Sequence, residues 1–120
     1  MNLATLHATL ATVTAAAGFA MVASGTWAAI RRDASSIRLV LVVRQAALIG
    51  AVLAAAAGAV AFVGGGHPRG GLHYLYAAFA LASVPLAISL AARNPRRGGL
   101  YHAGAGVLLL LMCFRLATTG

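Results

Sequence analysis

Long apolar runs, separated by three short breaks, divide the chain into four segments. A helix that crosses a bilayer needs about 20 mostly apolar residues. Four runs reach that length, at residues 3–30, 37–63, 72–92 and 100–118. The breaks are too short to hold further domains, so neighbouring helices must run in opposite directions. The pattern predicts an all-α integral membrane protein, a single domain over residues 1–120 with four antiparallel transmembrane helices.

The composition excludes a soluble globular domain and a disordered chain. The chain is 62% hydrophobic and 8% charged, with a mean hydropathy of +0.92. Soluble domains carry about 25% charged residues, and disordered chains need low hydrophobicity. No arginine or lysine lies in residues 1–30, so the first run lacks the basic start of a signal peptide and we expect it to be a retained span.

The charged residues predict an orientation. Arginine and lysine collect in cytoplasmic loops. Six arginines flank the first and third breaks and one lies in the second: Arg31, Arg32 and Arg38; Arg93, Arg96 and Arg97; and Arg69. We therefore expect a multi-pass protein of a bacterial inner membrane, with both termini and the second connection outside. Since the arginines follow topology, we expect no nucleic-acid partner.

The shortage of acids and cysteines excludes several kinds of chemistry. Asp33 is the only acid, so paired carboxylates cannot act within one copy, and Cys113 is the only cysteine. Ion-coupled transporters usually keep an ionisable group inside the membrane. Asp33 lies in a break, which argues against an ion-coupled transporter. Small multidrug transporters have this length and four helices, but the chain lacks their membrane glutamate. A small channel or carrier is the lowest-ranked hypothesis, and we expect no catalytic activity of the chain itself.

Small residues at four-residue spacing predict where the helices pack, because membrane helices associate through close approach. The small residues of the expected seams are Ala16, Ala20, Ser24 and Ala28 in the first run and Gly50, Ala54 and Gly58 in the second. In the fourth run the expected seam is Gly104, with Leu108 and Leu111 on nearby turns.

Ionisable side chains at membrane depth are costly and mark candidate functional positions. At ~1.5 Å per residue, His7 lies roughly 36 Å from Arg31 and His73 roughly 30 Å from Arg93, so both fall in the outer layer. Arg115 and Tyr76 fall near the same layer. Two histidines at one depth on different helices can be the axial ligands of a b-type haem. Arg115 would then pair with a haem propionate and Tyr76 would hydrogen-bond one.

This layout resembles that of haem-binding membrane bundles of the cytochrome b561 type, in layout and not in a motif matched residue by residue. A second haem would need another histidine pair on the inner side, where only His102 lies, so the chain supports at most one haem. A copper or zinc site on His7 and His73 would need a further ligand, such as His67. Histidine and tyrosine also belong naturally at membrane interfaces, which explains the same residues without any cofactor.

These observations support two alternative functions. The first is a non-catalytic accessory subunit of a larger membrane complex, such as a respiratory or photosynthetic electron-transfer complex. Its partners would be other membrane subunits or further copies of the chain, with Arg44 or Arg115 facing a partner's acid. The alternative is a b-type haem protein moving electrons, with His7 and His73 facing each other across a gap. Small residues would line that gap: Ala11, Gly18, Ala77 and Ala80.

Overall fold

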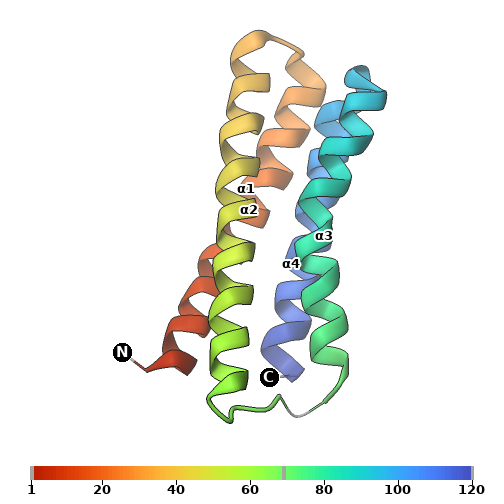
Figure 1. Ribbon diagram of the computed structural model, residues 1–120. Coiled ribbons are helices and arrows are strands. Elements are labelled where there is room, and N and C mark those ends of the chain that lie inside the picture. The colour runs from red at the N-terminus through yellow and green to blue at the C-terminus, as the bar shows by residue number, and fades with distance from the viewer. Residues whose placement is uncertain (1, 69, 120) are drawn as a thin grey trace.

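Four long helices make up nearly all of the computed structural model, which describes residues 2–68 and 70–119 (Figure 1). They are α1 (Leu3–Arg31), α2 (Ala34–Val63), α3 (Leu72–Arg93) and α4 (Gly98–Thr119), and the short 3-10 helix η1 (Pro95–Arg97) precedes α4. Each of the four is long and apolar enough to cross a membrane, so the chain is an all-helical, multi-pass membrane protein. Arg69, which we assigned to the second connection, lies outside the described residues.

The two ends of the bundle differ in what they hold. Figure 1 shows both chain termini and the α2–α3 connection at one end, which we call the termini end. The α1–α2 and α3–α4 connections lie at the other, which we call the arginine end. The molecule is 48 Å long, which exceeds the hydrocarbon thickness of about 30 Å. Both ends therefore reach the polar layers of a bilayer.

Helix α2 begins before the predicted span because Asp33 caps it. The Asp33 carboxylate accepts hydrogen bonds from the Ser36 backbone N–H at 2.8 Å and the Ser35 hydroxyl at 3.0 Å. Arg31 lies 3.4 Å from the second carboxylate oxygen. The hydrogen bonds from Ser36 above all, then those from Ser35 and Arg31, lower the pKa of Asp33 from 3.8 to about 2. The cap is therefore charged at neutral pH, which favours a helix N-terminus.

The closest helix packing joins α1 to α4 through glycines one heptad apart, Gly18 and Gly25 on α1 and Gly99 and Gly106 on α4. A Cβ added to Gly25 would lie 2.6 Å from the Gly99 carbonyl oxygen, and one added to Gly106 would lie 2.6 Å from that of Gly18. Backbone therefore meets backbone along this interface, which we call the glycine seam.

The remaining contacts arrange the chain as two helical hairpins. Helix α2 packs along α1 and α3 packs along α4, whereas α2 and α3 contact each other far less. Met21, Val84 and Leu109 are almost completely buried where the hairpins meet, with Ala47 of α2 beside them. The first and last long helices thus form the centre of the bundle.

The structure agrees with part of the predicted small-residue seams and contradicts the one on α4. Gly50 and Ala54 of α2 are buried, as are Ser24 and Ala28 of α1, but Ala16 is exposed. The seam expected on α4 is wrong, because Gly104 and Leu111 are exposed. The glycine seam turns a different face of α4 inward, made of His102, Ala105, Gly106, Leu109 and Cys113.

Candidate functional site

The termini end brings His7 and His73 together from opposite halves of the chain. His7 lies near the start of α1 and His73 near the start of α3, and both side chains are partly buried. Their ring centroids are 6.3 Å apart and the ring planes are inclined by 50°. The structure therefore places two imidazoles, separated widely in sequence, within reach of one common ligand.

The protonated nitrogen of His7 follows from its partner. His7 Nδ1 lies 2.9 Å from the Ala54 carbonyl oxygen, which can only accept, so Nδ1 carries the hydrogen and donates it. The ring lies against Gly58, where an added Cβ would approach Cε1 to 3.1 Å. Nε2 of the neutral ring is thereby left with a free lone pair.

The same reasoning applies to His73. Its Nδ1 lies 3.4 Å from the Thr119 hydroxyl, and that hydroxyl donates to the Arg115 carbonyl oxygen at 2.8 Å. Because the Thr119 hydrogen is already used, His73 Nδ1 must be the donor of the longer contact. Nε2 of His73 also keeps its lone pair. An outer partner on one ring nitrogen is the usual way in which proteins orient a histidine that ligates a metal through the other.

An aromatic cluster lies beside His73 on the α2–α3 side. The Phe62 ring contacts His67 at a centroid distance of 5.1 Å and Tyr74 at 6.0 Å, both edge to face. The Tyr74 ring lies 6.3 Å from that of His73. Sequence patterning did not single out Phe62, because a phenylalanine in an apolar run carries no signal of its own. These contacts join the end of α2 to the start of α3.

Two other predicted residues are not joined to the histidines. Tyr76 is partly buried and Arg115 is exposed. Among the described residues, neither side chain hydrogen-bonds to His7 or His73. Arg115 contributes through its carbonyl group, which holds the Thr119 hydroxyl in place.

Two finer expectations are wrong. Gly18 faces Gly106 and Leu110 in the glycine seam, and Ala80 is buried in the core, so neither residue lines a gap between His7 and His73. His67 contacts Phe62 instead of completing a metal site, and the described part of the chain holds no group of three His, Cys, Asp or Glu side chains that could bind a metal ion.

A second polar pair lies toward the arginine end. His102 Nδ1 donates to the Gly98 carbonyl oxygen at 2.7 Å, so Nε2 is the acceptor for the Arg44 guanidinium, whose Nη1 lies 3.5 Å away. His102 is 3% exposed. Arg44 Nε is buried without a hydrogen-bond partner among the described residues. The sequence analysis expected His102 on the inner side and expected Arg44 to face a partner's acid, and it did not pair the two residues.

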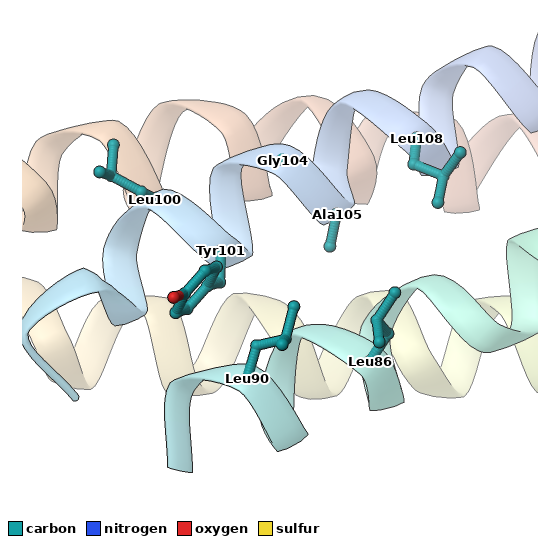
Figure 2. Close-up of a pocket in the computed structure, with 7 residues that line it drawn as sticks. All are labelled: Leu86, Leu90, Leu100, Tyr101, Gly104, Ala105 and Leu108. Atoms are coloured by element: carbon teal, nitrogen blue, oxygen red, sulfur yellow. The ribbon is translucent and has the colours of Figure 1, made fainter. Parts of the chain in front are cut away.

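A shallow groove of about 240 Å³ lies between α3 and α4. Figure 2 shows Leu86 and Leu90 of α3 and Tyr101 of α4 reaching into it, with Gly104 on its wall. A Cβ added to Gly104 would meet nothing within 4 Å, so the helix backbone is open to the outside there.

Comparison with known proteins adds no family to this description, since no family model, curated protein or solved structure matches the chain.

Proposed function

We propose that this protein binds one b-type haem through His7 and His73 and carries electrons within the membrane. The observation that supports the proposal is the closeness of the two imidazoles, whose centroids are 6.3 Å apart. Two imidazoles that bind one metal ion from opposite sides, with bonds of about 2 Å, place their ring centroids roughly 6 Å apart. The lone pairs on both Nε2 atoms supply the donors that a haem iron takes.

The chain's own residues would set the strength and direction of these donors. The Ala54 carbonyl and the Thr119 hydroxyl each accept a hydrogen bond from Nδ1, which orients the ring and leaves Nε2 as the nitrogen that can bind a metal ion. A bound haem would supply one-electron redox chemistry. Arg115 and Tyr76, on the helices near the same end, are the candidates to bind its propionates.

The proposed topology is antiparallel, with both termini outside a bacterial inner membrane. The arginines that flank the first and third connections support it, because cytoplasmic loops collect arginine. In this orientation the termini end, and with it the His7–His73 pair, lies on the outer side.

A reduced-minus-oxidised visible spectrum of the detergent-purified protein, produced with haem supplied, tests the haem proposal. We expect a sharp reduced band in the wild type that is lost in His7→Ala and His73→Ala, because each removes one iron ligand. His67→Ala is the matched control, since it removes a histidine from the same end that contacts Phe62 instead, and it should keep the band. A flat wild-type spectrum would overturn the proposal.

The second candidate is an accessory subunit of a larger membrane complex. The groove in Figure 2 favours it, because the open backbone at Gly104 and the apolar side chains around it suit a helix of another membrane subunit or of a second copy. This candidate predicts a flat spectrum together with a co-purifying membrane protein that is lost in Gly104→Leu, whereas the haem protein alone predicts the band.

A further inference from the structure

A cavity of about 220 Å³ lies toward the arginine end, between α2 and the hairpin of α3 and α4. Its polar lining consists of Arg44 and His102, and the rest is apolar or small, including Ala91 and Pro95. Two further lining residues, Ile37 and Leu41, are 50% and 43% exposed. The cavity is therefore open on the side that faces lipid in a membrane, where α2 and α3 contact each other little.

Arg44 carries a charge into this cavity that the chain does not neutralise. The only acid, Asp33, is already bound to Arg31, Ser35 and Ser36 in the α1–α2 connection. Within the described residues, the one polar contact of the Arg44 side chain is His102 Nε2 at 3.5 Å, and Arg44 Nε has no partner. A partly buried charge without a counter-charge is costly, so an anion in the cavity would stabilise the fold.

The surroundings restrict what that anion can be. His102 offers Arg44 a lone pair and no positive charge, because its hydrogen is on Nδ1. The same end also holds Arg93, Arg96 and Arg97, and the whole chain has a net charge of +8. Because the polar part of the lining is cationic and the remainder is apolar, the lining suits an amphiphile with an anionic headgroup.

We propose that this cavity binds an anionic phospholipid of the adjacent leaflet. Arg44 would donate hydrogen bonds from Nε and Nη to the headgroup phosphate, the paired geometry in which guanidinium groups bind phosphate. The acyl chains would lie against Ile37 and Leu41. The proposal does not depend on haem binding, because the cavity and the histidine pair lie toward opposite ends of the bundle.

Native mass spectrometry and thermal unfolding of the delipidated protein, titrated with dioleoyl phosphatidylglycerol or dioleoyl phosphatidylcholine in micelles, test this. We expect the wild type to bind phosphatidylglycerol about tenfold more tightly, because both headgroups carry a phosphate but only that of phosphatidylcholine adds a quaternary ammonium, which the uncompensated charge of Arg44 repels. Arg44→Gln should lose the preference. Arg38→Gln is the matched control, an exposed arginine of the same helix that does not line the cavity, and it should retain the preference.

A second variant keeps the test decisive if Arg44→Gln fails to fold. Ala91→Leu leaves the arginine in place and fills the cavity from the α3 wall, so it should also lose the preference for phosphatidylglycerol. Equal binding of the two lipids by the wild type, or an unchanged preference in Ala91→Leu and any folded Arg44→Gln protein, would overturn the proposal. Displacement of the lipid by inorganic phosphate at millimolar concentration would overturn it in favour of a free-anion site.

Discussion

Single glycines in this chain have opposite roles that depend on the helix face they occupy. At Gly25 an added Cβ would lie 2.6 Å from the backbone of α4, whereas at Gly104 it would lie in open space. Because the obstructing atoms at Gly25 belong to the backbone, no side chain can rotate away to make room. The two positions allow the same chemical change to be compared in two environments.

Gly25→Ala should destabilise the protein by about 1–3 kcal/mol, because the extra methyl group forces α1 and α4 apart. Thermal unfolding in detergent, followed by circular dichroism, measures the effect. Gly104→Ala is the control, and it should be neutral or stabilising by up to about 1 kcal/mol, because alanine favours a helix over glycine. Equal midpoints for the two variants would show that the glycine seam does not hold the bundle together.

The residues of the candidate site could be predicted only in part from the sequence. Counting residues from the arginines put His7 and His73 in one layer, and the structure has them at one end. Their partners could not be found in this way, because Ala54 offers only a backbone carbonyl and Thr119 looks like an ordinary terminal threonine. Which atoms meet depends on the rotation of each helix about its axis, which depth alone does not determine.

At the scale of the helix, Asp33 links the stability of α2 to acid pH. The folded protein holds the pKa of Asp33 at about 2, below its ordinary value of 3.8. A lowered pKa stabilises the fold at pH values above the unfolded pKa, and this stabilisation disappears as the carboxylate is protonated. The wild type should therefore lose stability as the pH falls from about 4 to about 2.

Asp33→Asn separates the charge from the cap, because asparagine caps helices about as well as aspartate but does not titrate. Unfolding midpoints measured from pH 5 to pH 2 should fall less steeply for this variant than for the wild type. Parallel profiles would mean that ionisation of Asp33 does not contribute to the pH dependence of stability.

The existence of the helices was far easier to predict than their faces. Hydropathy alone gave four spanning helices, because the bilayer requires a minimum apolar length. The inward face of α4 could not be predicted, because Gly99, Gly104 and Gly106 are all small and the sequence does not say which of them meets α1. The four-residue spacing of small residues on α2 was a better guide, since Gly50 and Ala54 do lie inside.

At the scale of the whole molecule, the proposed orientation predicts which connections are accessible from outside a cell. In a Cys113→Ala background, Gly70→Cys in the α2–α3 connection should react with a membrane-impermeant maleimide on intact bacterial cells. Asn94→Cys in the α3–α4 connection should react only after the membrane is permeabilised. Both positions lie outside the long helices, and a Cβ at Gly70 meets nothing within 4 Å. The reverse pattern would invert the topology, and the proposed outer position of the histidine pair with it.

The central place of the glycine seam has a consequence for how the protein is made. A ribosome makes α1 before α2, α3 and α4, yet α1 and α4 form the closest interface in the bundle. Until α4 has been made, the glycine face of α1 is covered by lipid or by another protein. The bundle therefore cannot close stepwise as its helices enter the membrane, and its assembly waits for α4.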